Sequence, residues 1–535
     1  MSFPSLILIT YFLLSLFGYT FAKRSNPNDT RPNIILFYPD TIRADTLSTY
    51  GHPLSKTPNY DRLASQGVLF EDHHVQHTQC TPSRCATFTG RYMHVLGHRT
   101  QTHLVRKYED NLFKYLKQTN YTTILLGKND ILAAESFNAS FTFWDGIIGT
   151  GGGGNAFKQD EAGYYSFFGK AAENCTGSSY ACNGDLRAVG DTIAFLKSDP
   201  PEPFLVYLPG IGAHPPYNAP EDYFSKYTAD QVRNSSPLRQ LLPGNNKPPH
   251  LQATGITGYR NLTSFHKTDD LFYNLSAVYL GRIAYVDYIL GVLLDGLDAS
   301  PLAKNTVLIA SSDHGDYQGD FQAVEKWPGG LEDVLTRVPL VIRAPGGVSG
   351  LRVKNPVMSI DLFPTILDLA QISLGPYDSV NFGISLLPWL MNATIPQNAH
   401  LFVYSEAGYS NYNEYEPNDP AQRSVYNDPT NMYFPRGKEE IEAPLDIDRA
   451  VMIKNSTHKL VFRPRGTSEL YDLTVDPHEL MNIFNVPSYS TMQTELLLEM
   501  LKWLILTGDV TPTDDDDRGL PPTPIPPFPW PPKVI

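Results

Sequence analysis

Residues Gln79–Arg91 read QCTPSRCATFTGR, a stretch that combines a cysteine, a proline, an arginine and a closing glycine. Pro82 suits the first turn of a helix, where its missing N–H group costs nothing, and Gly90 suits the position just past a helix end. We therefore expect a short helix that begins near Cys80. Free N–H groups at a helix start favour an anion, and the forked guanidinium of Arg84 matches a tetrahedral oxyanion. The stretch thus has the outline of a reaction centre.

The 535 residues allow one large domain with a smaller companion. The composition is 41% hydrophobic and 18% charged, as in ordinary globular proteins. The net charge of -14 argues against a nucleic-acid-binding protein, because such proteins carry basic faces. It does not exclude a substrate that is a sulfate or phosphate ester, since a pocket can be locally positive.

The first residues predict a secretory signal peptide over residues 1–22. Ser5 to Phe17 is apolar but short for a membrane span, and Thr20-Phe21-Ala22 resembles a small-residue cleavage site. An N-terminal membrane anchor is the alternative, and no later stretch is expected to span a membrane. We expect an extracellular or lysosomal glycoprotein. Nine Asn-x-Ser/Thr sequons agree with secretion: Asn28, Asn120, Asn138, Asn174, Asn234, Asn261, Asn274, Asn392 and Asn455.

The four cysteines, Cys80, Cys85, Cys175 and Cys182, allow three pairings. Cys175 and Cys182 flank a short Gly/Ser loop, so we expect these two to form a disulfide. A Cys80–Cys85 disulfide competes with this interpretation, and it would remove the proposed nucleophile.

Apolar runs and helical segments alternate along the first 395 residues, which predicts an α/β fold with a doubly wound, mostly parallel sheet flanked by helices. The expected strands are Asn33–Tyr38, Tyr121–Leu126, Phe204–Leu208, Thr306–Ala310 and Pro339–Arg343, and the expected helices include Asn111–Gln118, Leu186–Lys197, Leu271–Leu297 and Ile360–Ala370. Ligands in such sheets bind beyond the carboxyl ends of the strands. Asp40, Lys128, His214 and the pair Asp313-His314 all follow strand ends, so we expect them to converge.

The pattern changes after residue 395. Three short strands, at Ala450–Ile453, Lys459–Phe462 and Glu469–Leu473, and a helix at Met492–Leu506 predict a smaller C-terminal α+β subdomain with a short antiparallel sheet. We expect a catalytic domain over residues 23–395, this subdomain over 396–510, and a disordered acidic and proline-rich tail over 511–535.

The run CTPSR followed by TGR resembles the signature of the sulfatases, the formylglycine-dependent branch of the alkaline phosphatase superfamily. The resemblance implies that Cys80 is oxidised to formylglycine by the formylglycine-generating enzyme in the secretory pathway. Matching motifs extend from about residue 32 to 370, and Arg449–Asn482 resembles the C-terminal region of the family. The similarity therefore covers most of the mature chain.

The resemblance also implies one bound Ca²⁺. Asp40 matches the first of two adjacent metal-binding aspartates, and Asp313-His314 matches an Asp followed by Asn or His. Oxygen-rich sites of this kind suit a hard divalent cation. The expected metal ligands are Asp40, Thr41, Cys80, Asp313 and His314. Thr41 departs from the family pattern, because it places an uncharged hydroxyl where the second aspartate stands.

The other expected catalytic residues are Arg84, Lys128, Asp130, His214 and Lys326, beside Cys80. The resemblance implies that a hydroxyl of the formylglycine hydrate attacks sulfur, with Arg84, Lys128, Lys326 and the metal stabilising the sulfuryl oxygens. His214, before Pro215-Pro216-Tyr217, is placed to protonate the leaving alcohol. The family's next histidine is replaced by Asp130, and we hypothesise that Asp130 removes the last proton.

These features predict a sulfuric ester hydrolase that acts on a sulfated small molecule or glycan. One alternative is a phosphate or phosphonate ester hydrolase with the same anion site. Another is a catalytically impaired sulfatase-like protein that binds glycans, which the departures at Thr41 and Asp130 would favour. His98, Arg99 and His103 follow the signature closely and are candidates for the substrate mouth.

Overall fold

The central strand of the fold is β1 (Asn33–Phe37), whose five residues are all buried. It pairs in parallel with β5 on one side and β6 on the other. Successive residues of a strand face opposite sides, and accordingly Ile35 and Phe37 pack into one hydrophobic core while Ile34 and Leu36 pack into another. A continuous apolar strand is therefore covered on both faces, as in doubly wound α/β proteins.

The computed structural model describes residues 29–145, 180–215, 217, 219–240, 270–374, 381–408 and 447–508. Its main sheet has the strand order β4-β3-β5-β1-β6-β7-β2-β8. The bounds are Phe143–Trp144 (β4), Thr122–Leu125 (β3), Phe204–Leu208 (β5), Thr306–Ser311 (β6), Leu340–Arg343 (β7), Val68–His74 (β2) and Leu351–Met358 (β8). Only β7 runs against its neighbours in this sheet, so the expectation of a mostly parallel sheet is confirmed.

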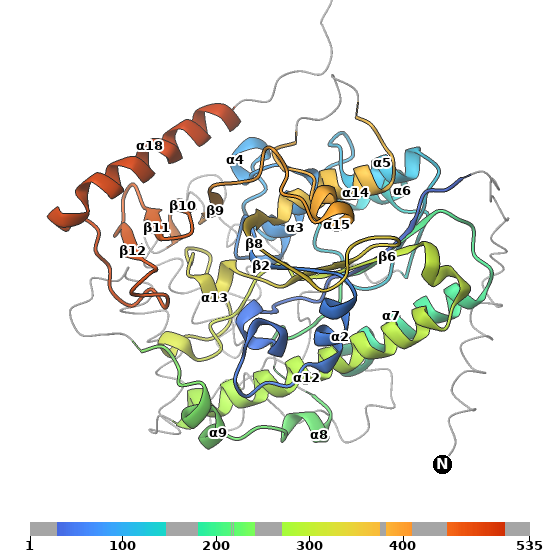
Figure 1. Ribbon diagram of the computed structural model, residues 1–535, viewed down its shortest axis with the longest axis horizontal. Helices are drawn as coiled ribbons and strands as arrows, with labels where there is room; N and C mark the ends of the chain where they lie inside the picture. Colours follow the sequence, from blue (N-terminus) through green and yellow to red (C-terminus); the bar gives the residue numbers. More distant parts are fainter. Residues whose placement is uncertain are drawn as a thin grey trace, which may run out of the picture.

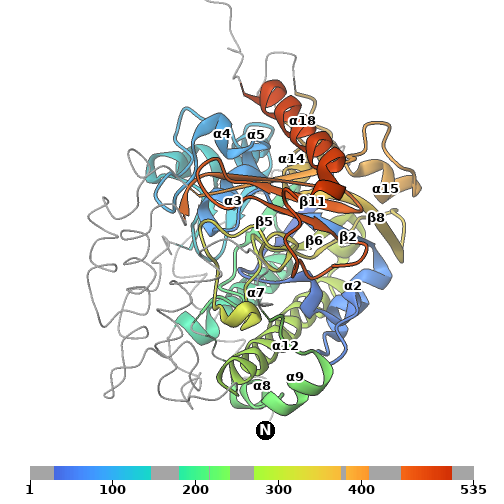
Figure 2. The same cartoon turned by 90° about the vertical axis from the view of Figure 1, so that its left-hand side faces the viewer.

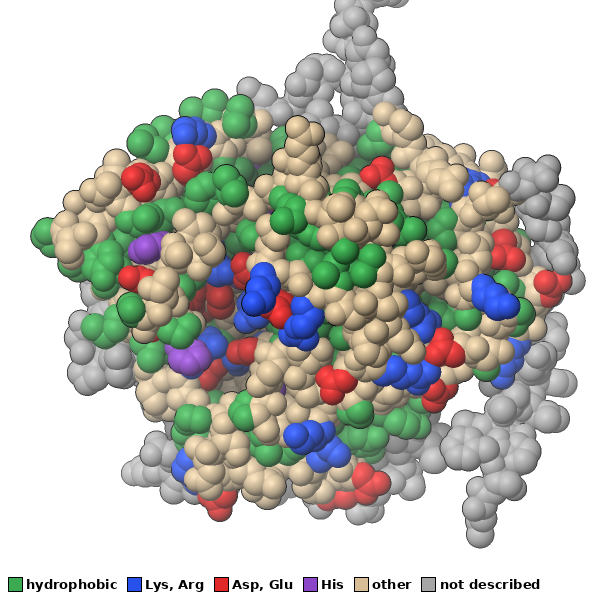
Figure 3. Space-filling model, in the orientation of Figure 1, with side chains coloured by type: hydrophobic (Ala, Val, Ile, Leu, Met, Phe, Trp, Pro, Cys, Tyr) green, Lys and Arg blue, Asp and Glu red, His purple; other side chains and the backbone are tan. Residues whose placement is uncertain are grey.

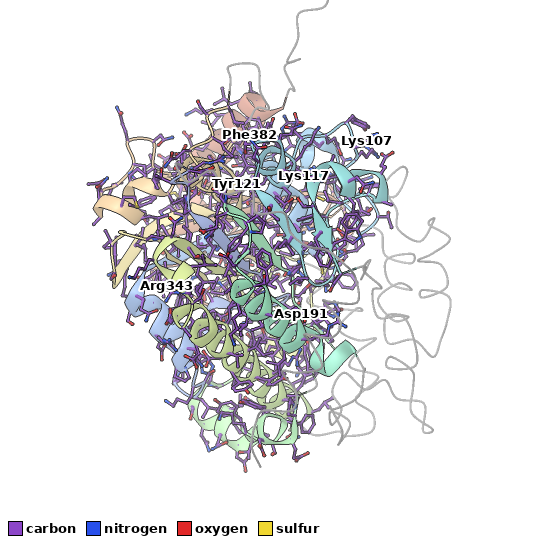
Figure 4. All side chains as sticks on the ribbon, turned by 90° about the vertical axis from the view of Figure 1, so that its right-hand side faces the viewer. Lys107, Lys117, Tyr121, Asp191, Arg343 and Phe382 are labelled. Atoms are coloured by element: carbon purple, nitrogen blue, oxygen red, sulfur yellow. The ribbon has the colours of Figure 1, made fainter. Side chains whose placement is uncertain are left out.

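Helices cover the two faces of the sheet as separate layers (Figure 1). One layer holds α2 (Pro58–Gln66), α7 (Tyr180–Lys197), α8 (Glu221–Phe224), α9 (Ala229–Ser235) and α12 (Asp270–Asp298). The other holds α3 (Cys80–Thr89), α4 (Met93–Leu96), α5 (Leu112–Gln118), α6 (Phe137–Ser140), α14 (Leu362–Leu369) and α15 (Leu387–Asn392). Figure 4 shows the two layers from the side, with Lys117 of α5 in one and Asp191 of α7 in the other.

A separate sheet of four antiparallel strands lies beside the main sheet (Figure 2). Its strands are β9 (Val403–Ala407), β10 (Ala450–Lys454), β11 (His458–Phe462) and β12 (Glu469–Asp472), and α18 (Ser490–Thr507) packs against it. The outer face of α18 exposes leucine and isoleucine side chains, including Leu501 and Ile505. Hydrophobic side chains are accordingly visible at the surface over this helix, at the upper left of Figure 3. The smaller sheet is thus confirmed, while the domain boundaries remain predictions.

Strands β2, β4, β8 and β9 were missing from the expected set, and composition explains the omission of β2 and β8. The second half of β2 is polar, and its Asp72 and His74 contact Lys454 of the small sheet. Strand β8 lies at the sheet edge and contains Arg352, Lys354 and Pro356, residue types that edge strands tolerate. Both strands lack the apolar run that marks a buried strand.

One expectation about membrane spans needs correction. In the described part of the chain, the helix Leu271–Asp298 is long and apolar enough to cross a membrane, although the sequence was expected to contain no such stretch. In the most apolar 18-residue segment of this helix, 89% is buried inside the protein. The helix packs against α2, α7, α8 and α9. Its apolar character is therefore accounted for by the core of the protein.

Several expectations fall outside the described residues: the signal peptide, the tail after residue 510, and the side chains of Cys175 and Cys182. Three sequon asparagines, Asn28, Asn174 and Asn261, fall there as well. The other sequons can be located. Asn455 is half-buried, and the remaining five are exposed: Asn120, Asn138, Asn234, Asn274 and Asn392. Their exposure is what N-glycosylation requires.

Candidate active site

Four neighbouring strands end at the same edge of the main sheet, and each is followed by a candidate residue. Asp40 follows β1, Lys128 follows β3, His214 follows β5 and Asp313 follows β6. The sheet order β3-β5-β1-β6 places these strand ends side by side. The expected convergence is therefore observed at the level of the strands, and the side-chain contacts below extend it.

Helix α3 begins at Cys80 and ends before Gly90, as the sequence predicts. Gly90 has a positive φ of 68°, and its N–H donates to the carbonyl of Ala86, which closes the helix. Cys80 is only 5% exposed. Burial, together with the nearby carboxylate of Asp40, raises the pKa of the Cys80 thiol, so the unmodified side chain is a neutral thiol rather than a thiolate nucleophile.

Four potential metal ligands cluster around the thiol. The ligand atoms of Asp40, Cys80, Asp313 and His314 all lie within 4.8 Å of one another, and all four residues are buried. Nδ1 of His314 lies 2.8 Å from the carbonyl oxygen of Gly315, so Nδ1–H is the donor and Nε2 keeps a free lone pair. That Nε2 atom lies 3.2 Å from Sγ of Cys80. Two carboxylates and an imidazole lone pair at one point fit a divalent cation.

Arg84 is completely buried and its guanidinium faces the two carboxylates. Nε lies 2.8 Å from Asp313, Nη2 lies 3.1 Å from Asp40, and Nη1 donates to the hydroxyl of Tyr207 at 3.0 Å. The sequence suggested that the Arg84 guanidinium binds substrate, but in the structure it binds protein groups. Arg84 can hold both carboxylates in position. Tyr207 was not foreseen because it lies within an apolar strand.

Lys128 bridges Asp40 and Asp130. Its Nζ forms ion pairs with both, at 2.8 Å to Asp130. Burial opposes ionisation of both carboxyls, but the adjacent ammonium group outweighs it and keeps the pKa of Asp130 below, and that of Asp40 well below, the usual range. Asp130 is therefore ionised at neutral pH, as a proton acceptor must be.

Lys326 and His214 contact each other across the site. Nζ of Lys326 lies 3.2 Å from Nε2 of His214, and Nδ1 of His214 lies 2.7 Å from the carbonyl oxygen of Pro215. Nδ1–H is therefore the donor to Pro215, and Nε2 accepts from Lys326. Glu325 holds the ammonium group of Lys326 at 2.6 Å. Glu325 was also missed by sequence reasoning, although it directly precedes Lys326.

Thr41 has a positive φ of 64°, an unusual conformation for a β-branched residue and one associated with functional sites. Its N–H donates to Asp313 at 3.1 Å, its carbonyl accepts from Tyr279 at 2.7 Å, and its hydroxyl donates to Asp40. These contacts hold the strained turn. They also direct the hydroxyl at a candidate metal ligand, so Thr41 orients Asp40 in this structure.

The Cys80–Cys85 disulfide is excluded, because both residues are free thiols. Cys85 is buried in the core, where its Sγ lies 3.7 Å from the carbonyl oxygen of Ile131. In the loop after the signature, His98 and Arg99 are buried and His103 is half-buried. His98 is directed at Glu109, with Nε2 3.4 Å from Oε1, and Arg99 forms an ion pair with Glu406.

Comparisons with known proteins find matches over most of the chain. A family model described as Sulfatase matches residues 32–372. The chain is 25% identical over 539 residues to "Multifunctional alkaline phosphatase superfamily protein PehA" of Trinickia caryophylli, an alignment that covers 90% of the chain and 97% of that protein. It is 24% identical to an N-acetylglucosamine-6-O-sulfatase of Bacteroides thetaiotaomicron, with 91% of the chain and 89% of that protein covered.

Among solved structures, a phosphonate monoester hydrolase from Silicibacter pomeroyi has a TM-score of 0.69 to this chain at 22% identity. The match covers 90% of the chain and 96% of that protein. At this level of identity the likeness shows a shared fold.

Proposed function

Because the chain belongs to the sulfatase family and is a sulfuric ester hydrolase, we propose that it removes sulfate from sulfate monoesters of a glycan. We further propose that Cys80 is converted to formylglycine and that a divalent cation binds at Asp40, Asp313 and His314. The observation that carries the proposal is the enclosure of Cys80 by these three ligands at the start of α3. The glycan substrate is supported by the similarity to an N-acetylglucosamine-6-O-sulfatase.

In this proposal the cation supplies Lewis-acid polarisation, and the formylglycine hydrate supplies both the attacking hydroxyl and the hydroxyl whose proton must later leave. Arg84 holds Asp40 and Asp313 in position through its buried fork. Lys128 and Lys326 present positive charge to the sulfate oxygens. Asp130, ionised beside Lys128, is the proposed acceptor for the departing proton.

The proton for the leaving alcohol is assigned to the Lys326–His214 pair. Burial, with the charge of Lys326 next, lowers the pKa of His214 to about 4, so its imidazole is neutral at pH 7. The ammonium group of Lys326, 3.2 Å from Nε2, carries the proton that the pair shares. Lys326 first transfers this proton to Nε2 of His214, and Nε2–H then gives it to the leaving oxygen, so the imidazole returns to its neutral form and Lys326 is left as the amine.

The test combines chemistry at Cys80 with activity. The wild-type protein, made in a secretory eukaryotic host, is digested and the peptide containing Cys80 is analysed by mass spectrometry. Sulfate release is measured on 4-nitrophenyl sulfate and on a panel of sulfated monosaccharides that includes N-acetylglucosamine 6-sulfate. We expect an aldehyde at position 80 and sulfate release that the Cys80→Ala variant lacks. An unmodified Cys80 in an active enzyme would contradict the mechanism.

Hydrolysis of phosphonate or phosphate monoesters is the second candidate. Thr41 favours the phosphate monoester in particular, since an uncharged residue beside Asp40 leaves the site more positive, and a phosphate monoester is a dianion whereas sulfate and phosphonate monoesters are monoanions. The similarity to PehA, described as a multifunctional member of the alkaline phosphatase superfamily, supports this alternative, and the phosphonate monoester hydrolase shares the fold. The values of kcat/KM on 4-nitrophenyl sulfate, on 4-nitrophenyl phosphate and on 4-nitrophenyl phenylphosphonate, compared with one another, decide between sulfate and phosphorus esters.

A further inference from the structure

The loop that leads into α3 contains buried polar groups that the proposed mechanism does not use. Gln79 and His77 are both completely buried. The N–H of Gln79 donates to Nδ1 of His77 at 3.1 Å, so the neutral ring carries its proton on Nε2. Neither this Nε2–H nor either polar atom of the Gln79 side chain has a hydrogen-bond partner among the described residues. Buried groups of this kind are normally paired with protein, water or ligand.

Gln79 occupies the N-cap position of α3, but its side chain does not cap the helix. A capping residue accepts a hydrogen bond from the first helical turn, yet the N–H of Thr81 donates instead to the side-chain oxygen of Gln101 at 3.2 Å. The Gln79 amide is therefore not needed by the helix. It is available to a molecule that reaches the residue next to Cys80.

Arg99 adds a third buried group near the start of α3. It is 4% exposed, its Nη2 pairs with Glu406, and its Nη1 has no partner in the described part of the chain. The loop that carries it lies across the helix start, because the hydroxyl of Thr81 donates to the carbonyl of Gln101. The charges of Arg99 and of His314 both act on the ring of His77, so His77 is near both Arg99 and the proposed cation site.

The charges of Arg99 and Glu406 cancel, and the ring of His77 is neutral. Burial opposes ionisation of Glu406, but Arg99 and His94 outweigh it and lower its pKa to about 2, so Glu406 is a carboxylate that neutralises Arg99. Burial lowers the pKa of His77 to about 3, which leaves the ring neutral. A neutral set of donors with one amide acceptor suits hydroxyl groups, which both donate and accept. It is less suited to a second sulfate, which would bring negative charge without a free cation.

We propose that Gln79, His77 and Arg99 form a pocket that binds hydroxyl groups of the sugar beside the scissile sulfate. The proposal rests on the proposed function, since it takes the sulfate to lie at Cys80. In this pocket the three residues discriminate between sugar and aryl esters, because a site built to hydrogen-bond hydroxyls loses those bonds when the substrate lacks them. They contact the leaving group and not the reacting sulfur.

The decisive variant is Gln79→Met, which keeps the length of the side chain and removes its amide. Arg99→Lys keeps the ion pair with Glu406 and removes the second nitrogen. For each variant we expect kcat/KM on the best-cleaved sulfated monosaccharide to fall about tenfold, chiefly through KM, since each lost hydrogen bond is worth roughly 3- to 10-fold. The value on 4-nitrophenyl sulfate should change less than about threefold. Gln118→Met, the same exchange at an exposed position at the end of α5, should change neither.

Three results would overturn the pocket. Equal losses on both esters would mean that Gln79 only supports the helix start, and unchanged kinetics would mean that water fills the pocket. A loss confined to disulfated sugars would mean that it binds a second anion. Binding of the unsulfated parent sugar, followed by saturation-transfer NMR, separates this inference from the proposed function. If the wild type releases no sulfate but binds the sugar and Gln79→Met does not, the pocket stands and the proposed function fails.

Discussion

Nζ of Lys326 lies 3.2 Å from Nε2 of His214. The other ring nitrogen donates to the carbonyl of Pro215, so the ring meets the ammonium group as a neutral acceptor. A histidine proposed to protonate the leaving alcohol therefore depends on its lysine neighbour for the proton. The role of His214 can therefore be tested with substrates whose leaving alcohols differ in pKa.

The first prediction concerns His214→Gln. We expect kcat/KM on alkyl sulfates to fall by about 10² to 10⁴, the usual size of a general-acid contribution. The loss on 4-nitrophenyl sulfate should be much smaller, because nitrophenolate leaves without a proton. The plot of log kcat/KM against the pKa of the leaving alcohol should steepen accordingly. An equal loss across all leaving groups would exclude His214 from proton transfer.

The second prediction concerns the cation. Chelation by EDTA should abolish activity and lower the thermal unfolding temperature, because Asp40 and Asp313 then remain buried without the cation. In His314→Asn an oxygen replaces the imidazole nitrogen, and imidazole suits transition metals better than calcium. After EDTA treatment, the activity restored by Ca²⁺, divided by that restored by Mn²⁺, should therefore be higher in this variant than in the wild type. Metal content is measured by plasma mass spectrometry, and retention of full activity without metal would contradict the site.

The third prediction concerns Asp130. Asp130→Asn removes the proposed proton acceptor but keeps a side chain of the same size next to Lys128. We expect a rapid burst of about one equivalent of 4-nitrophenol per enzyme, followed by turnover slowed about 100-fold. Stopped-flow absorbance separates the two phases. Normal steady-state turnover would show that another group accepts the proton.

The fourth prediction concerns stability. Arg84→Met removes the cation that pairs with Asp40 and Asp313 in the buried site. In the metal-free protein we expect the free energy of unfolding to fall by about 3 kcal/mol, since a buried charge loses its partner.

Arg62→Met is the matched control, because its ion pairs with Asp295 and Asp298 are exposed and should contribute less than about 1 kcal/mol. Urea unfolding monitored by circular dichroism measures both variants. Equal losses of unfolding free energy in the two variants would show that the buried ion pairs of Arg84 stabilise the fold no more than the exposed pairs of Arg62.

The fifth prediction concerns acid. Burial lowers the pKa of His52 to about 4 and that of His73 and His77 to about 3. Between about pH 6.5 and 4 the unfolded chain therefore binds more protons than the folded protein, so the free energy of unfolding falls as pH falls. Burial raises the pKa of Asp287 and Asp316 to about 6, which acts in the opposite direction below pH 6.

The imidazoles outnumber these carboxyls, so we expect the unfolding temperature to fall from pH 7 to pH 4.5. Asp287→Asn should make the fall steeper, because it removes one opposing group. Differential scanning fluorimetry across this range tests both statements. An unfolding temperature that rises toward pH 4.5 would show that the carboxyl groups dominate.

Much of the fold was predictable because it is encoded locally. Apolar runs such as Ile34–Phe37 and Val307–Ala310 are buried on both faces, and this pattern is visible without any partner strand. Strand β8 was not predictable, since its charged residues and Pro356 are acceptable only at a sheet edge. Its position depends on β2, almost three hundred residues earlier in the chain, and no local pattern reports that pairing.

The sequence by itself determined the family signature around Cys80, the helix that begins there, and the strand ends that carry Asp40, Lys128, His214 and Asp313. These features depend on residue type and short-range spacing, which the chain states directly. Only the tertiary structure decided where each polar side chain points. It directed Arg84 at two carboxylates, turned the Thr41 hydroxyl toward Asp40, and left the Gln79 side chain without a partner among the described residues. The contacts of Arg84 join residues distant in sequence, and burial rather than local propensity selects them.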